Sequence, residues 1–201
     1  MRRGRAADDA PGRRLFVAVP IPTATRDEIA AVVEEVRAAA DPAVRDVRWV
    51  RLEGLHLTLR FLGPTTDDRL SGVVAAVDRT AEETAPFPIE IGGAGAFPSI
   101  GRPRILWFGV LRGYEELAAA AARLDDGLAA RGWPREDRPF RAHLTLARSD
   151  GVRAGPQVAE RLVAAAESLR TSFVARSVVV LETVAGRGPA RYETVHEAVL
   201  A

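Results

Sequence analysis

Cysteine is missing from the 201-residue sequence, so disulfide bonds and thiolate chemistry are excluded. Long apolar runs are missing too, because stretches such as Leu117 to Leu124 fall well short of the ~20 residues that cross a bilayer. The opening segment MRRGRAADDAPGR is polar and contains no apolar core of a signal peptide. These absences predict a cytoplasmic protein with no membrane partner. We expect residues 1–13 to be a disordered leader and 14–201 to form a single domain.

Lysine is absent as well, so all 28 basic residues are arginine, and 27 acidic residues leave a net charge of only +1. Arginine suits bidentate recognition of phosphate. A GC-rich coding bias, which favours arginine and alanine together, explains the same composition more simply. Since so small a net charge gives no global attraction to nucleic acid, any contact with nucleic acid must be local.

Hydrophobic periodicity predicts short strands that alternate with four helices. We expect the helices at about 23–40, 65–84, 114–131 and 156–169. We expect strands at 14–21, 47–50, 56–62, 87–99, 104–111, 143–148, 172–183 and 191–200. This pattern is typical of an α+β fold with mainly antiparallel sheets and with helices packed outside.

The tetrapeptide HLTL occurs twice, beginning at His56 and at His143, and it uses two of the three histidines in the chain. Each copy follows a strand and a helix, and each precedes a helix and a pair of strands. This order indicates an internal duplication. A bilobal fold with approximate twofold symmetry would bring both motifs to one central cleft.

Alternation along a strand predicts which side chains of the first motif share a face. His56, Thr58 and Arg60 are expected on one face, and the leucines and Phe61 on the other. The motif would therefore present an imidazole and a hydroxyl, roughly 7 Å apart at Cα, on one side of an anchored strand.

The second motif follows the same alternation, which groups Arg141, His143, Thr145 and Ala147 on one face. Its leucines then turn to the core. Because an unperturbed imidazole titrates near pH ~6.5, one histidine can act as a base while another acts as an acid. Two threonine hydroxyls can donate to phosphate oxygens. The two motifs together predict a metal-independent phosphodiester site.

Plainer interpretations apply to a single copy of the motif. A lone histidine on an alternating strand is usually a structural residue, whereas two copies of HLTL favour a joint catalytic role. No HxH, HExxH or cysteine ligand accompanies the histidines, so we expect no metal, and no nucleotide-binding glycine motif is present, so we expect no cofactor. His196 lacks a threonine two residues on and is expected to be a structural or surface residue.

A family resemblance rests on these motifs and their surroundings. RWVRLEGLHLTLRFLG, FPSIGRPRILWFGV and DRPFRAHLTLAR resemble the two-histidine (2H) phosphoesterase superfamily. Within it the chain is most similar to the RNA 2′,3′-cyclic phosphodiesterases of bacteria and archaea, also named 2′-5′ RNA ligases. The resemblance covers about 14–200 and implies two similar α/β lobes around a cleft. It also implies that RNA 2′,3′-cyclic phosphate ends are opened to 2′-phosphates without metal or nucleotide.

The resemblance implies roles for individual residues. His56 would be the proton donor to the departing 3′ oxygen, and His143 would be the base that activates water. Thr58 and Thr145 would hold phosphate oxygens. Arg148 matches a family arginine near the phosphate, although strict alternation puts it opposite His143 unless the strand ends or bulges first.

Phe16 matches an aromatic position beside the base in the family, and it fits the apolar core equally well. The loop ETVAGRGPARYE keeps the Gly-Pro turn and Tyr192 but lacks a serine that is common earlier in this loop, which leaves the choice of substrate open.

Other functions remain in view. The same residues could run the reaction backwards and join RNA ends through a 2′-5′ linkage, or act on a small-molecule cyclic phosphate. A third alternative is a module that binds RNA ends without turnover, although the chain lacks the interleaved aromatic and basic residues of a stacking platform. The expected partner is RNA with 2′,3′-cyclic phosphate ends, tRNA fragments included, and the expected oligomeric state is a monomer.

Overall fold

The computed structural model describes residues 12–39, 47–149, 155–184, 186 and 188–201. The expected leader at 1–13 lies outside the described residues except for its last two positions, and Arg13 already begins a strand. The described strands are β1 (Arg13–Pro20), β2 (Val47–Trp49), β3 (His56–Thr65), β4 (Phe87–Phe97), β5 (Ile105–Arg112), β6 (His143–Ser149), β7 (Thr171–Ala175), β8 (Ser177–Val184) and β9 (Arg191–Val199). The described helices are α1 (Thr23–Ala38), α2 (Asp67–Glu82), α3 (Tyr114–Ala129), α4 (Gly155–Ala165) and the short 3-10 helix η1 (Leu52–Gly54).

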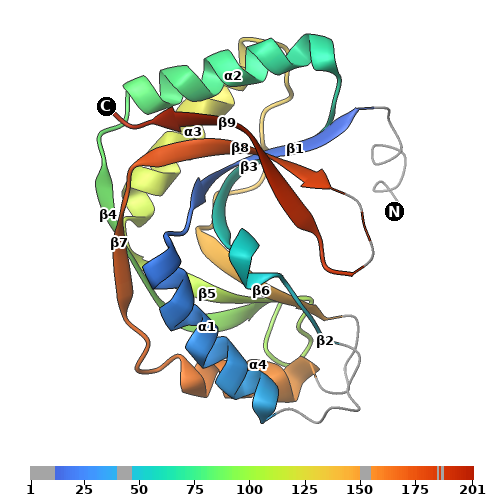
Figure 1. The fold of residues 1–201 in the computed structure, drawn as a ribbon, viewed down its shortest axis with the longest axis vertical. Helices are drawn as coiled ribbons and strands as arrows, with labels where there is room; N and C mark the ends of the chain where they lie inside the picture. Colours follow the sequence, from blue (N-terminus) through green and yellow to red (C-terminus); the bar gives the residue numbers. More distant parts are fainter. Residues whose placement is uncertain (1–11, 40–46, 150–154, 185, 187) are drawn as a thin grey trace.

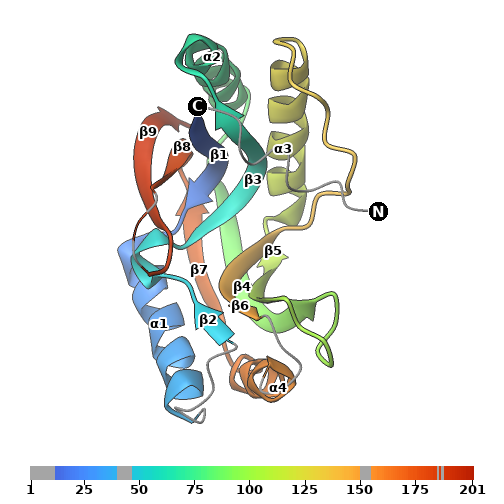
Figure 2. The same ribbon diagram turned by 90° about the vertical axis from the view of Figure 1, so that its right-hand side faces the viewer.

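The four α-helices lie where hydrophobic periodicity predicts them. In α1, Ile29, Val33 and Val36 are buried because their spacing puts them on one helical face. Figures 1 and 2 show the helices in two pairs, α2 with α3 and α1 with α4, at the two ends of the sheet. Within the described residues, no helix is both long and apolar enough to span a membrane.

All nine strands of the described residues belong to one antiparallel sheet, which confirms the α+β class. Eight of them follow the order β7-β4-β5-β6-β3-β1-β8-β9, and β2 pairs with β6. The order divides the sheet into two halves of four strands, β7 to β6 and β3 to β9, that meet where β6 pairs with β3. Each half contains one HLTL strand at this central seam.

The two halves of the sheet are not two halves of the sequence. The β4–β5 hairpin follows α2 in the chain, yet it joins β6, whereas β8 and β9 return to pair beside β1. The single strand predicted at 172–183 is therefore wrong. It divides at Arg176 into β7, which pairs with β4 at one edge, and β8, which pairs with β1 in the other half.

The two faces of β1 carry different apolar clusters. Leu15, Val17 and Val19 point into the main core beneath the helices. Phe16 and Ala18 point to the other face, where they form a small cluster with Val179. Because the HLTL strand β3 pairs directly with β1, this small cluster forms the floor of the face that carries the motifs.

Candidate active site

The two motifs meet at the seam of the sheet. Leu57 of β3 pairs with Leu144 of β6 in antiparallel register. Both leucines are buried in the core, so the residues before and after each of them turn to the opposite face. Continuing the register by one residue puts His56 across from Thr145. The same step in the other direction puts Thr58 across from His143, which gives the two histidines and two threonines approximate twofold symmetry about the leucine pair.

Each motif strand contains a β-bulge at the same position. In β3, Ala18 pairs with Thr58 and Val17 with Arg60, so Leu59 is an extra residue. The same count in β6, where Thr145 pairs with Trp107 and Ala147 with Leu106, makes Leu146 the extra residue. Both bulges lie three residues after the histidine, and each reverses the alternation of faces beyond it.

The bulge in β3 overturns the prediction that Arg60 shares a face with His56. Arg60 is only 9% exposed. Its Nη1 donates to Glu136 at 2.7 Å, its Nη2 donates to the Pro134 carbonyl, and its Nε lies 3.3 Å from Asp125. The prediction failed because strict alternation counts Leu59 as an ordinary strand residue. Arg60 is a structural cation that holds β3 to α3 and to the segment before β6.

Phe61 and Arg148 occupy equivalent places on the site face, five residues after each histidine. Phe61, predicted to face the core, is 59% exposed, and its ring lies 5.9 Å from that of Phe16. Arg148 is exposed, and its charge acts on the pKa values of both His143 and Tyr192. Arg148 could reach the site only if the strand ended or bulged before it, and the bulge at Leu146 meets this condition.

Both imidazoles are held in the same way by the backbone. His56 Nδ1 lies 2.7 Å from the Gly54 carbonyl oxygen, and His143 Nδ1 lies 2.7 Å from that of Arg141. Because a carbonyl only accepts, Nδ1 of each ring must carry the hydrogen. Each neutral imidazole therefore keeps the lone pair on Nε2, and among the described residues neither Nε2 has a hydrogen-bond partner.

Burial lowers the pKa of both histidines below its usual value near 6.5. For His56, desolvation outweighs the bond to the Gly54 carbonyl, which raises the pKa, and His143 lowers it further. For His143, desolvation again outweighs the bond to its carbonyl, and the Arg148 cation lowers the pKa further. Each ring therefore favours the neutral form. The pKa of His56 also depends on the charge state of His143, and the pKa of His143 depends on the Arg148 cation.

Aromatic rings surround the two imidazoles. Tyr192 meets His56 edge to face with ring centres 5.1 Å apart, and Phe97 meets His143 in the same way at 5.1 Å. Phe16 packs 4.7 Å from the His56 ring and is only 3% exposed. Phe16 thus supports the His56 imidazole from below, whereas the Phe61 ring is largely exposed to solvent.

The sequence left three of these aromatic residues without a role. Phe61 was assigned to the wrong face by simple alternation, and Phe97 was treated only as part of a strand. Tyr192 stood out only as a feature of the last loop. Their contacts with the motifs depend on strands that are distant in the sequence, so no local signal could have placed them.

His196 lies apart from this arrangement. Its Nε2 is 2.5 Å from a carboxylate oxygen of Asp78, so it ties β9 to α2. Its predicted structural role is confirmed by this contact. In the described part of the chain, no three histidine or acidic side chains are grouped so that they could hold a metal ion.

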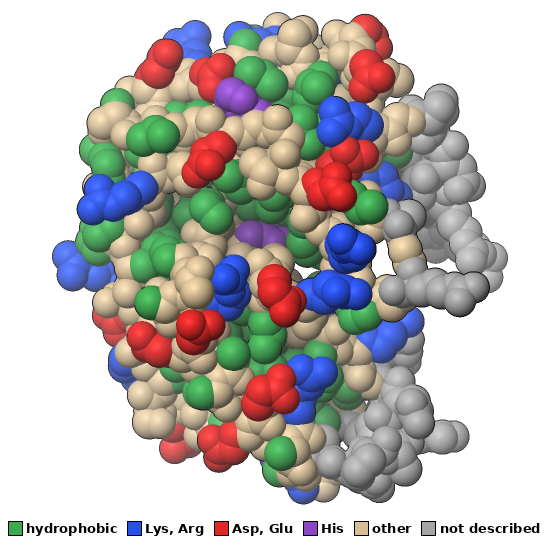
Figure 3. Space-filling model, viewed as in Figure 1, with side chains coloured by type: hydrophobic (Ala, Val, Ile, Leu, Met, Phe, Trp, Pro, Cys, Tyr) green, Lys and Arg blue, Asp and Glu red, His purple; other side chains and the backbone are tan. Residues whose placement is uncertain are grey.

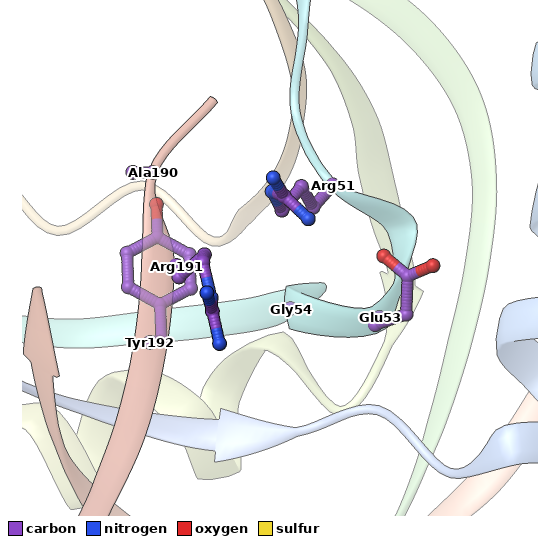
Figure 4. A pocket seen from close by; sticks show the side chains of 6 residues that line it. All are labelled: Arg51, Glu53, Gly54, Ala190, Arg191 and Tyr192. Carbon is purple, nitrogen blue, oxygen red and sulfur yellow. The ribbon is translucent and has the colours of Figure 1, made fainter. Parts of the chain in front are cut away.

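Figure 3 shows a histidine recessed near the middle of the face in view, with apolar side chains above it and with arginines and an acidic side chain below it. A small pocket opens beside His56, lined by Arg51, Glu53, Gly54, Ala190, Arg191 and Tyr192 (Figure 4).

Comparisons with known proteins agree on one family. A family model described as the 2′-5′ RNA ligase superfamily matches residues 25–187. A protein of Archaeoglobus fulgidus named RNA 2′,3′-cyclic phosphodiesterase is 36% identical over 148 residues, which cover 73% of this chain and 77% of the relative. A Thermus thermophilus protein of the same name is 39% identical over 149 residues, covering 67% of this chain and 68% of the relative.

Solved structures share the fold across almost the full chain. The crystal structure of Escherichia coli LigT complexed with 3′-AMP has a TM-score of 0.70 at 22% identity, and the match covers 94% of this chain and 98% of LigT. A crystal structure from Thermus thermophilus has a TM-score of 0.64 at 27% identity, covering 93% of this chain and 97% of that one. The bilobal α+β architecture expected from the motifs is thus a known one.

Proposed function

The chain belongs to the 2′-5′ RNA ligase superfamily, and we propose that it hydrolyses RNA 2′,3′-cyclic phosphodiester ends to 2′-phosphomonoester ends. The observation that carries this proposal is the meeting of the two HLTL motifs at one seam. In each motif the imidazole Nδ1 is bound to a carbonyl, and Nε2 has no hydrogen-bond partner among the described residues. The names of the two relatives described above support the same reaction.

The hydrolysis needs one base and one acid. Nε2 of His143 takes a proton from water, and the water oxygen attacks phosphorus. Nε2 of His56, protonated, donates to the ribose 3′ oxygen as the bond between that oxygen and phosphorus breaks. The product carries a 2′-phosphate and a free 3′-hydroxyl, while His143 ends protonated and His56 neutral. Proton exchange with solvent then restores both rings.

The electrostatics of the site support His143 as the base and His56 as the acid. The Arg148 cation disfavours a charged His143, which suits a base that must begin neutral. A charged His143 would lower the pKa of His56, so a neutral His143 allows His56 to hold a proton. A bound phosphate anion would stabilise the protonated His56 further.

The phosphate oxygens need donors that are already in place. Thr58 and Thr145 lie across from the two histidines in the continued register, where their hydroxyls would donate to the non-bridging oxygens. Arg148 adds a positive charge that stabilises the negative charge developing on phosphorus. Phe16 contributes by holding the His56 ring from below rather than by an exposed surface.

A single product analysis tests the proposed reaction. A short RNA with a 2′,3′-cyclic phosphate end is incubated with the protein in the presence of EDTA, and the products are separated by chromatography. We expect only the 2′-phosphate, because in the proposed mechanism His56 donates its proton to the 3′ oxygen. A 3′-phosphate product would reverse the assignment of acid and base, and an unchanged substrate would contradict the function.

The pH dependence of hydrolysis follows from the lowered pKa values. The base must be neutral, so activity falls as pH drops below its pKa, and the acid must be protonated, so activity falls as pH rises above its pKa. Because burial lowers both values in the free enzyme, we expect a bell-shaped kcat/KM profile centred below pH ~6.5. The kcat profile should lie at higher pH, since the bound anion favours protonated imidazoles. A kcat/KM profile centred above pH ~7 would contradict this expectation.

The reverse reaction uses the same groups. When RNA ends are concentrated, the 5′-hydroxyl of a second end takes the place of water and attacks the phosphorus of the cyclic phosphate. His143 removes the proton of that hydroxyl, His56 protonates the departing 3′ oxygen, and the product is a 2′-5′ phosphodiester with a free 3′-hydroxyl, which is consistent with the description of the family model. We place hydrolysis first because water is present in large excess. Fragments of tRNA with cyclic ends are suitable substrates, and we propose that a monomer acts on them in the cytoplasm.

A further inference from the structure

The pocket beside His56 is a separate feature from the seam at which the two histidine strands meet. Its volume is about 190 Å³, and its lining comes from the segment 51–54 and from the segment 190–192 (Figure 4). Six or so water molecules would fill this space at ~30 Å³ each. The pocket is therefore large enough for a phosphodiester group with part of a ribose.

Two arginines give the pocket its chemistry. Arg51 and Arg191 enter it from different segments (Figure 4), and Arg51 is positioned by a bond from its Nε to the Pro189 carbonyl. Within the described residues, no carboxylate forms an ion pair with either guanidinium. Glu53 is the one acidic residue in the lining. The pocket thus has a positive balance and several free donors, which suit an anion with two or more oxygens.

The pocket is connected to His56 by two direct contacts. Gly54, which lines the pocket, accepts the His56 Nδ1 hydrogen bond through its carbonyl. Tyr192, which also lines the pocket, packs its ring against the His56 imidazole. An added Cβ at Gly54 would lie 2.8 Å from the Tyr192 ring, so only glycine allows this packing. The pocket is therefore on the side of the proposed acid.

The side of the acid is also the side of the RNA chain. In the proposed reaction His56 protonates the departing 3′ oxygen, which belongs to the terminal ribose, whereas the attacking water approaches from the opposite side of phosphorus. The rest of the RNA is attached to this ribose through its 5′ carbon. The next phosphodiester must therefore lie beyond His56, and not beyond His143.

We infer that this pocket binds the phosphodiester between the last two nucleotides of the RNA, with Arg51 and Arg191 as its donors. This inference rests on the proposed function, and it makes these two arginines specificity residues. The enzyme would then act more efficiently on oligonucleotides than on mononucleoside cyclic phosphates. The pocket distinguishes RNA ends from small cyclic phosphates, a choice that the two HLTL motifs cannot make.

The test compares three substrates: a mononucleoside 2′,3′-cyclic phosphate, a dinucleotide with the same end, and that dinucleotide with a neutral methylphosphonate linkage. We expect the wild type to prefer the charged dinucleotide, and the methylphosphonate to remove that preference. The double variant Arg51→Gln/Arg191→Gln should lower kcat/KM for the charged dinucleotide about tenfold and leave the mononucleoside rate within about twofold. The matched control Arg37→Gln/Arg79→Gln removes two exposed helical arginines, changes the net charge equally and should leave all three rates unchanged.

Several results would overturn the inference. These are an equal loss on the mononucleoside and dinucleotide substrates, an equal loss in the control variant, or a methylphosphonate dinucleotide that reacts as fast as the charged one. Absence of turnover on every substrate would instead contradict the proposed function. In that case a measurement of binding affinity tests the role of the pocket. A dinucleotide with a 3′-phosphate should bind the wild type about tenfold more tightly than the mononucleotide, and equal affinities would refute the inference.

Discussion

Replacing either His56 or His143 with alanine should lower kcat on a cyclic-phosphate RNA by about 10² to 10⁴-fold, the usual worth of one general acid or base. The two residues act in one step, so the double variant should be little slower than the slower single variant. Single-turnover kinetics with saturating enzyme measures this loss without interference from product release.

The shape of the remaining pH profile identifies each role. A His143→Ala enzyme lacks the base, so the acidic limb of its profile should disappear. A His56→Ala enzyme lacks the acid, so the basic limb should disappear. His196→Ala is the matched control, because it removes the third histidine, which pairs with Asp78 away from the seam. Full activity in either motif variant, or a comparable loss in the control, would refute the two-histidine mechanism.

Arg60 and Phe61 form a pair of neighbours whose variants should behave in opposite ways. Arg60→Met removes a cation that is 9% exposed and contacts Glu136, Asp125 and the Pro134 carbonyl. Because both carboxylates stay partly exposed, we expect a loss of about 2 to 4 kcal/mol in the free energy of unfolding, below the range for a fully buried pair. Thermal unfolding should show this as a decrease of about 5 to 15 °C in Tm.

Phe61→Ser, in contrast, removes a ring that is 59% exposed. Its effect on the free energy of unfolding should stay within about 0.5 kcal/mol. The KM for RNA should rise, since the ring lies on the site face beside Phe16.

The activity of the Arg60 variant separates the two residues further. Well below the unfolding temperature, Arg60→Met should keep kcat within about tenfold of the wild type. The reverse pattern, with a stable Arg60→Met and an unfolded Phe61→Ser, would show that the strand runs without the bulge at Leu59.

Local patterns in the sequence were enough to predict the four α-helices and to frame the catalytic hypothesis. Helices α1 to α4 could be predicted because their apolar residues repeat at helical spacing, which depends on neighbours within the same segment. The catalytic hypothesis needed only residue types, since two imidazoles and two hydroxyls in repeated strand motifs limit the chemistry strongly. His196 could be set aside for the same local reason.

The division of the sheet could not be predicted from the same patterns. The segment 172–183 has uniform strand character, so nothing local marks the change at Arg176 from β7 to β8. That change occurs because β7 finds its partner in β4 and β8 finds its partner in β1. Pairing with distant strands also carries the β4–β5 hairpin into the half that holds the second motif.

The sequence by itself determined that this chain carries a duplicated histidine and threonine motif on strands of an α+β fold. The tertiary structure alone decided how these motifs face one another and what lies around them. A bulge exists only as a mismatch with a partner strand, so Leu59 and Leu146 could not be recognised as extra residues until β1 and β5 lay beside them. Those two residues turn Arg60 into the core and bring Phe61 and Arg148 to the site, because every side chain beyond a bulge changes face.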